Sequence, residues 1–334
     1  MKIYSFYIGI DVSKLKLDIN ILNPITMIGE HLVINNTLKD VNLFIKLLIK
    51  KGIDTCSILF CCENTGNYTN HLMYALLDLK LDLWIVPAIE IKRAKGLVRG
   101  KSDKIDARDI AVYSLKNQEK IRLTEVIDQD ISKLKLLYTE REKMVKSLLI
   151  MESTSESKSF LNKEVFKEVV SINLSLINKI KKSIFEIERK IKQIIKSNEK
   201  LNKQSELIKT IPGIGEQTSI YLIIATKGFT SFSSWRKFAC YCGIAPFEYS
   251  SGSSIKGRTK VSHIADKKMK SLLQMCAMTS IKHDSQMKEY YNKKRNEGKN
   301  AMLVLNNVRC KLISRVFAVI MREKPFIDTY KFAS

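Results

Sequence analysis

Two carboxylates three residues apart are the first pair in this sequence whose spacing could do chemistry. Asp103 and Asp106 follow Gly100, and neither glycine nor proline recurs before Pro212, so we predict that they begin a helix. Residues three apart share one face of a helix, and two acids there repel each other unless a cation lies between them. Magnesium or manganese suits such oxygen ligands. The alternative is a solvated helix start, because acids favour the first turn.

Two further acids follow predicted buried strands. Asp11 comes directly after the apolar run at residues 3–10, and Glu63 comes directly after the run at 57–62. The whole N-terminal part is predicted as strands at 3–10, from residue 14 and at 31–35, a helix at 38–51, a strand at 57–62, a helix at 67–80, a strand at 83–86 and the helix from 103.

This order of elements matches the ribonuclease-H-like fold, in which three antiparallel strands are followed by strand–helix units. In that fold, acids on the first strand, on the fourth strand and on a later helix meet at one edge of the sheet. We therefore expect Asp11, Glu63, Asp103 and Asp106 to meet there. Two divalent ions roughly 3.5–4 Å apart would fit four acids and support phosphoryl transfer.

A long helical region is predicted to follow, because residues 101–211 contain neither glycine nor proline. Apolar residues recur there at alternating spacings of three and four, which indicates a coiled-coil seam within the chain or between chains. The seam residues are Phe166, Val170, Ile177, Ile180, Ile184, Ile187, Ile191, Ile194, Leu201 and Ile208. A serine-rich stretch at 153–157 is expected to divide the region into a helical hairpin; a plain packed helical bundle is the alternative.

Two glycine-containing segments in the C-terminal part could bind phosphate. Residues 211–215 resemble a helix-hairpin-helix turn, in which Gly213 and Gly215 let backbone N–H groups approach a DNA phosphate; a tight turn without a ligand is the alternative. Residues 243–260 are predicted to form a loop in which cations and a glycine could hold phosphate, or a serine could act as a nucleophile. The phosphate-binding candidates of this loop are Gly252, Lys256, Arg258 and Lys260.

The composition points to a polyanionic partner. The chain has 334 residues with 57 Lys and Arg against 34 Asp and Glu, a net charge of +23, and nucleic acid is the partner that this excess favours. We expect a cytoplasmic protein without a membrane association, because the N-terminus has no signal-peptide pattern and no apolar run approaches a membrane span. Seven cysteines without a Cys-x-x-Cys pair indicate buried thiols rather than a zinc site.

These features together resemble the DEDD transposases of the insertion-sequence family numbered one hundred and ten, described as bridge-RNA-guided recombinases. The segments that carry the resemblance lie at residues 7–14, 63–68, 101–107, 211–215 and 243–252, in the family's order. One departure lies at residues 263–267, where many relatives carry Lys-x-Gly-Asn.

The resemblance implies a RuvC-like domain at 1–125 with Asp11, Glu63, Asp103 and Asp106 as the magnesium-binding tetrad. The helical region is taken as an arm at 126–208, and the resemblance implies that the domain at 209–334 is a transposase domain with a catalytic serine that becomes covalently attached to DNA. The serine is Ser251, with Ser250 as the adjacent alternative. Donor and target DNA, a guide RNA encoded by the element, and assembly into a dimer or tetramer are the implied partners.

Two other functions remain open from the residues. The tetrad could hydrolyse DNA without a serine adduct, as in a Holliday-junction resolvase or another metal-dependent nuclease. Alternatively, the chain could be a non-catalytic nucleic-acid-binding protein that dimerises through its helical arm. A denaturation-resistant adduct at Ser251 would distinguish the recombinase from both.

Overall fold

The computed structural model describes residues 2–94, 102–125, 128–153, 162–251, 255–261 and 265–327. The chain divides into two compact units, Met1–Val126 and Ile127–Ser334, and each is described by itself. The finer division into three parts, with boundaries after residues 125 and 208, stays a prediction.

The first unit is built on a five-stranded mixed sheet. Its strands are β1 (Phe6–Val12), β2 (Lys16–Leu22), β3 (Gly29–Asn35), β4 (Ile58–Glu63) and β5 (Leu83–Val86), in the order β3-β2-β1-β4-β5. The first three strands are antiparallel, and the chain direction of β1, β4 and β5 is the same. The predicted α/β class is thus confirmed, and the sheet is compatible with a ribonuclease-H-like fold.

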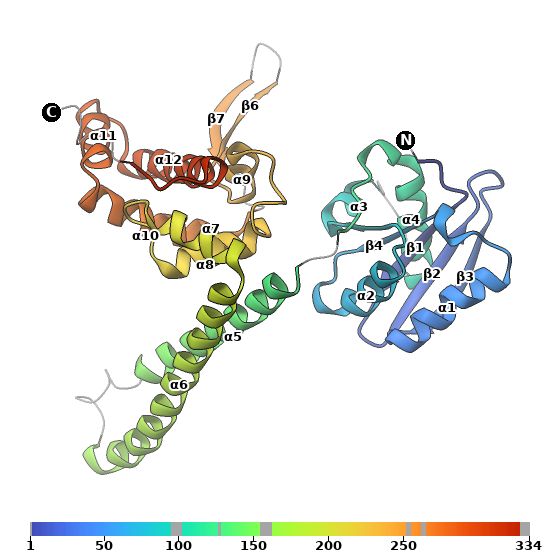
Figure 1. The fold of residues 1–334 in the computed structure, drawn as a ribbon, viewed down its shortest axis with the longest axis horizontal. Helices are drawn as coiled ribbons and strands as arrows, with labels where there is room; N and C mark the ends of the chain where they lie inside the picture. The colour runs from blue at the N-terminus through green and yellow to red at the C-terminus, as the bar shows by residue number, and fades with distance from the viewer. Residues whose placement is uncertain are drawn as a thin grey trace. The chain divides into compact units, whose positions relative to one another are not determined.

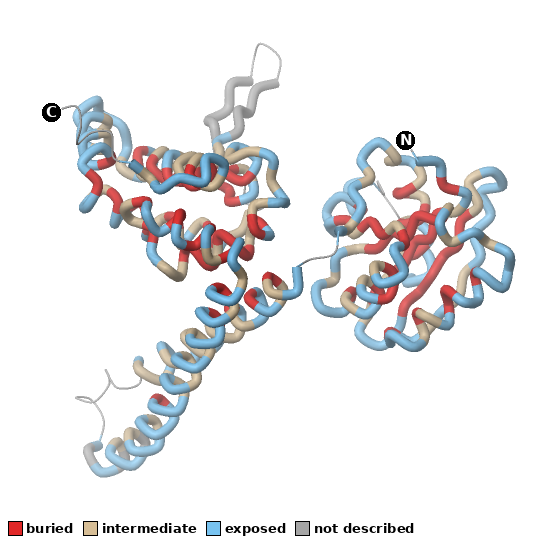
Figure 2. The backbone as a smooth tube through the Cα atoms, in the orientation of Figure 1, coloured by how far each residue is buried: buried red, intermediate tan, exposed pale blue. Residues whose placement is uncertain are grey.

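Helices cover both faces of this sheet (Figure 1). On one face, α1 (Leu38–Lys50) and α2 (Asn70–Asp78) bury a row of apolar residues against alternate positions of the strands, such as Ile8 and Ile10. On the other face, α3 (Ala88–Ala94) and α4 (Asp103–Lys116) pack on Tyr7, Leu59 and Cys61. The central strands are buried as a result (Figure 2).

Two polar residues of β2 are buried. Asp18 and Asn20 alternate with apolar residues, which predicts that they face solvent, but both are buried because α4 lies over this part of the sheet. The buried position of Asp18 matters for the site described below.

The second unit is mainly helical. Two long helices, α5 (Gln129–Ser153) and α6 (Lys163–Ser197), lie side by side (Figure 1). They are followed by α7 (Glu199–Lys209), α8 (Glu216–Thr226), α9 (Trp235–Tyr241), α10 (Lys267–His283), α11 (Ser285–Asn296) and α12 (Ala301–Arg322). Three residues near the end of the apolar seam, Ile191, Leu201 and Ile208, are buried in the common core of this unit.

The helical region predicted for residues 101–211 has further breaks besides the one expected at the serine-rich stretch. The chain leaves the helical conformation after Lys116, and it breaks again at Asn198, whose side chain accepts a hydrogen bond from the Leu201 N–H. Asparagine caps a helix through such a bond, so a helix can begin anew there without glycine or proline. The coiled-coil assignment of α5 and α6 stays a prediction.

The prediction of a loop at residues 243–260 is wrong, because most of this segment forms a β-hairpin. Strand β6 (Pro246–Ser251) pairs with β7 (Ile255–Val261) in antiparallel register. The connection at 252–254, which contains Gly252, lies outside the described residues. Aromatic and β-branched residues on either side of the connection favour strands.

All seven cysteines are free thiols. Within the described ranges, no group of three or more Cys, His, Asp or Glu side chains is arranged to hold a metal ion, so the structure gives no support to a zinc site there. No helix in the described part of the chain is both long and apolar enough to cross a membrane.

Candidate active site

Two of the four predicted acids lie at the same edge of the first sheet because their strands are parallel neighbours. The register of β1 and β4 places Ile10 opposite Cys62, and Asp11 and Glu63 are the next residues along the two strands. Both are partly buried. The strand order, with β4 directly beside β1, is what brings acids from positions 11 and 63 together.

The other two acids are brought to this edge by the close packing of α4 on β1. Gly9 makes that packing possible, because a Cβ atom at this position would overlap the Ala107 carbonyl oxygen and the Ala111 backbone nitrogen. Any other residue would push the helix backbone away. The Ser102 side chain accepts a hydrogen bond from Ile105 N–H and so begins the helix at Asp103.

The acids act on one another electrostatically. The pKa of Asp11 is raised from 3.8 to about 6, first because partial burial disfavours the charged form, and then because of the negative charges of Asp106, Asp103, Asp18 and Glu63. All four predicted residues are therefore near enough to interact, and Asp18 is a fifth acid that the sequence did not reveal.

Asp18 lies directly opposite Asp11 in the antiparallel β1–β2 pair. Its Oδ1 is 3.1 Å from His31 Nε2, and its Oδ2 is 3.0 Å from Lys16 Nζ. The Lys16 ammonium also lies 2.7 Å from Asp103 Oδ2. Its position in the sequence could have revealed this acid. In a hairpin of β1 and β2 joined by a short turn, Asp18 is the residue that pairs with Asp11.

A divalent metal fits this cluster by chemistry and charge. The donors are carboxylate oxygens, which magnesium and manganese prefer. The raised pKa of Asp11 reflects burial first and then neighbouring negative charge, which a cation would neutralise. The described residues nevertheless contain no three acids already drawn together at the spacing of a metal site. The donor set is thus suitable, but the side chains must close on the ion.

The predicted serine lies in the second unit, at the end of β6. Ser251 pairs in register with Ile255, and Ser250 pairs with Lys256. The hairpin therefore places both candidate serines in the last two positions before the connection. Of the predicted phosphate-binding cations, Lys256, Arg258 and Lys260 occupy alternate positions of β7, whereas Gly252 lies outside the described residues.

The two predicted phosphate-binding glycines differ in their surroundings. Gly213 has a φ of +94°, and a Cβ there would lie 2.8 Å from the Cys276 carbonyl oxygen and from the Ser280 backbone nitrogen. Close packing on α10 thus explains this glycine without a ligand. Gly215 is exposed, with open space where a side chain would begin, and is the N-cap residue of α8.

The segment after the hairpin is held by a polar network at the start of α10. The Asp266 carboxylate accepts hydrogen bonds from the hydroxyl groups of Tyr221, at 2.9 Å, and Tyr241, at 3.3 Å, and from the Met269 N–H. Burial and the nearby Asp266 charge raise the pKa of Tyr241 to about 12, so its hydroxyl remains a donor at neutral pH. These contacts fix the residue at which the chain enters α10.

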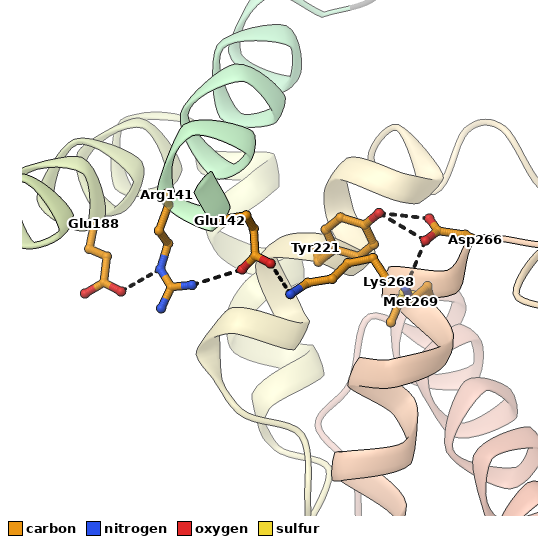
Figure 3. Close-up of polar contacts among 7 residues, drawn as sticks. All are labelled: Arg141, Glu142, Glu188, Tyr221, Asp266, Lys268 and Met269. Carbon is orange, nitrogen blue, oxygen red and sulfur yellow. Dashed lines mark hydrogen bonds and ion pairs between the residues drawn. The ribbon is translucent and has the colours of Figure 1, made fainter. Parts of the chain in front are cut away.

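An adjacent row of ion pairs connects the two long helices with α10 (Figure 3). Arg141 of α5 contacts Glu188 of α6 through its Nε, at 2.6 Å, and contacts Glu142 at 3.2 Å. Glu142 in turn pairs with Lys268 in the first turn of α10. The base of the α5–α6 pair is therefore joined to the helix that follows the serine hairpin.

Comparisons with known proteins match both units. The model for the transposase family IS116/IS110/IS902 matches residues 205–292, and a transposase model for DEDD enzymes of the IS110 type matches residues 8–163. The first match includes the serine hairpin and the second includes all four acids.

The similarity to individual proteins extends along almost the full chain. A pilin gene-inverting protein of Moraxella bovis is 27% identical over 323 residues, which cover 96% of this chain and 97% of the relative. The pilin gene-inverting protein of Moraxella lacunata is 27% identical over 326 residues with the same coverage. An uncharacterized 42 kDa protein of insertion element IS900 from Mycobacterium paratuberculosis is 31% identical over 99 residues, 29% of this chain and 25% of that protein.

Proposed function

The chain belongs to the IS110 family of DEDD transposases and is a DNA transposase or recombinase, and from this premise we propose how its residues divide the reaction. Asp11, Glu63, Asp103 and Asp106 would hold magnesium or manganese, and Ser251 would attack DNA. The proposal is supported by the electrostatic effect of Glu63, Asp103 and Asp106 on Asp11 and by the close approach of α4 to Gly9.

A bound divalent metal would neutralise charge on the scissile phosphate and stabilise the leaving oxygen. The four acids would orient that ion, since two come from rigid strand ends and two from a capped helix start. The raised pKa of Asp11 leaves it largely ionised only above about pH 6, so metal binding and activity should both decline below that value.

In the proposed covalent step, the Ser251 hydroxyl oxygen forms a bond to phosphorus while one P–O bond of the DNA backbone breaks. The serine proton is released to solvent or a base, and the departing DNA oxygen becomes a hydroxyl group. The DNA is then attached through a phosphoserine ester, which conserves the bond energy for rejoining to a second DNA end. A serine hydroxyl is a weak nucleophile unless it is activated, so the bound metal would have to assist its attack.

Nucleic-acid contacts are proposed for the hairpin and for Gly215. Lys256, Arg258 and Lys260 occupy alternate positions of β7, which is the spacing at which residues of a strand share a face. The exposed Gly215 begins α8, and helix N-termini favour phosphate. Gly213 is proposed to help by shaping the turn that precedes α8. Gly252 is proposed to contact phosphate because of its position in the sequence. The net charge of +23 supports an extended footprint on donor DNA, target DNA and an element-encoded guide RNA.

Oligomerisation is proposed through the helical arm at 126–208. Several large apolar side chains on α5 and α6 are exposed, including Ile150 and Phe185, each with 69% of its surface accessible. Exposed apolar residues in such number on two adjacent helices suit pairing with another copy. A dimer or tetramer of this kind would use the arm to pair protomers that each carry a RuvC-like domain at 1–125 and a transposase domain at 209–334.

The experiment that tests the proposal is adduct mapping. The full-length protein, produced together with RNA from the DNA flanking its reading frame, is incubated with donor and target DNA and magnesium, and denatured products are analysed by mass spectrometry. We expect a DNA-linked peptide containing Ser251 that is lost in Ser251→Ala and retained in the matched control Ser250→Ala. Metal-dependent cutting without any adduct would instead identify a nuclease, and nucleic-acid binding without cutting would identify a binding protein.

A further inference from the structure

Lys16 is a cation that contacts the acid cluster directly. It is the first residue of β2, and its Nζ bridges Asp103 of α4, at 2.7 Å, and Asp18 of β2, at 3.0 Å. Of the two acids, Asp103 is half exposed, whereas the side chain of Asp18 is only 6% accessible.

The backbone around Lys16 is held in place by the turn that connects β1 and β2. Ser13 Oγ donates a hydrogen bond to the Lys16 carbonyl oxygen and accepts one from the Lys16 N–H. The Ser13 carbonyl oxygen in turn accepts from the Asn36 side chain, at 2.8 Å. The backbone of Lys16 is therefore held in place, and the conformation of its flexible side chain determines which carboxylate its ammonium contacts.

The two acids that it bridges hold it differently. Asp18 is buried and also contacts His31, so it is fixed, and burial makes an unpaired charge there costly. Asp103 is half exposed at a helix start and has room to change its partner. If the contact with Asp103 broke, Asp18 would still keep the ammonium at the edge of the cluster.

We propose that Lys16 is a resident counter-ion of the acid cluster, which occupies Asp103 in the metal-free protein and withdraws to Asp18 when a divalent ion binds. This inference rests on the proposed metal-binding function of Asp11, Glu63, Asp103 and Asp106. Lys16 acts through Asp103 and Asp18 and is a positioning residue. It lowers the mutual repulsion of the acids before the metal arrives, and it weakens metal binding because its charge repels the ion and competes for a ligand.

The size of the competition follows from Coulomb's law. A unit charge about 6 Å from a divalent ion, screened by a water-like dielectric constant of about 80, changes the ion's affinity about tenfold. Removing the charge of Lys16 should therefore tighten metal binding by about that factor. Strand-exchange activity need not rise, so the affinity itself is the quantity to measure.

The test is titration of the full-length protein with Mn²⁺ by isothermal titration calorimetry, without nucleic acid. Lys16→Met keeps the length of the apolar stem and removes the charge, and Lys16→Arg keeps the charge. Lys14→Met is the matched control, because it removes a charge from the same turn at an exposed residue that has no ion pair with any described residue. Trp84 fluorescence in a Trp235→Phe background confirms that the first unit of each variant is folded, and Lys16→Gln replaces Lys16→Met if the latter is not folded.

We expect about tenfold tighter Mn²⁺ binding for Lys16→Met, and binding within about threefold of the unchanged protein for Lys16→Arg and Lys14→Met. Equal or weaker binding by Lys16→Met would overturn the counter-ion proposal while leaving the metal site intact. Equal tightening by Lys14→Met would also overturn it, since a general charge effect would then suffice. If the unchanged protein bound no Mn²⁺ at all, the proposed metal function itself would fail.

Discussion

Replacing Asp11 by asparagine should stabilise the metal-free protein although it removes a proposed catalytic residue. The pKa of Asp11 is raised from 3.8 to about 6 by burial and by neighbouring acids, so its charged form is disfavoured in the folded state. A pKa change of about two corresponds to about 3 kcal/mol. Because Asp11 is only partly buried, solvent screening reduces this to about 1 kcal/mol.

The sign of the pH dependence follows from the raised pKa. Below about pH 4 the carboxyl group of Asp11 is protonated in both the folded and the unfolded protein, and it does not lower the free energy of unfolding. As the pH rises through about 6, the folded protein must release a proton that it binds more tightly than the unfolded chain does, so its free energy of unfolding falls. The asparagine of the Asp11→Asn variant does not titrate, and the advantage of the variant should grow between about pH 4 and 6 and then level off.

Asp18 provides the matched comparison, since it lies across from Asp11 in the same sheet. It is buried and contacts both Lys16 and His31, so Asp18→Asn would leave His31 without this acid partner and Lys16 with Asp103 alone. Breaking one side of a buried pair is destabilising by about 3 kcal/mol. The same chemical change at two opposed positions should therefore have opposite effects on stability.

The assay is urea unfolding in EDTA at several pH values. The chain has two tryptophans, of which Trp84 is buried in the first unit and Trp235 lies in the second, so a Trp235→Phe background makes the fluorescence specific for the first unit. Asp11→Asn should gain about 1 kcal/mol at pH 7.5 and nothing near pH 4. A loss of stability at pH 7.5, or a gain that did not depend on pH, would refute the electrostatic account of the cluster.

Three further outcomes are expected. Gly9→Ala should destabilise the first unit by about 3 kcal/mol through overpacking against α4 and should weaken Mn²⁺ binding, which calorimetry and urea unfolding would measure; unchanged values would mean that α4 yields easily at this contact. Nucleic-acid affinity should fall steeply between about 50 and 200 mM salt in a filter-binding titration, because counterions are released from phosphates, and a flat response would assign the basic excess another purpose. Mixed oligomers of Ser251→Ala and Asp106→Ala chains should recover DNA attachment on the Asp106→Ala chain if the serine of one protomer works with the acids of another, and recovery that failed in verified mixed oligomers would indicate a site within one chain.

Much of the first unit could be predicted from its sequence because local and long-range signals agree there. The strand at Leu83–Val86 has the predicted bounds, and α1 begins where Thr37 accepts a hydrogen bond from Asp40 N–H. The second unit was harder, because the short helix at Trp235–Tyr241 has no long periodic pattern, and because the serines near β6 resemble a loop when they are read without their pairing strand.

The arrangement of the acids could be predicted only in outline. The fold determines which strand ends are neighbours, and hence that Asp11 and Glu63 share an edge. The sequence does not show that Gly9 faces a helix, that α4 covers the polar side of β2, or that Lys16 reaches back across the turn. These depend on the packing distance between a helix and a strand that lie far apart in the chain.

Two clusters of charged residues in this protein have the same residue types but different electrostatic outcomes. In the second unit, Arg141 lies between Glu142 and Glu188, and Lys268 pairs with Glu142, so each acid has a basic partner and the row joins helices. In the first unit, burial and then four neighbouring acids raise the pKa of Asp11, and Lys16 is a cation in contact with two of these acids. Natural selection for stability alone favours the first arrangement, because repelling acids lower the free energy of unfolding. A cluster in which acids raise one another's pKa is expected to bind a ligand of opposite charge. This contrast, more than the number of acids, is the physical argument for proposing the first cluster as the site of chemistry.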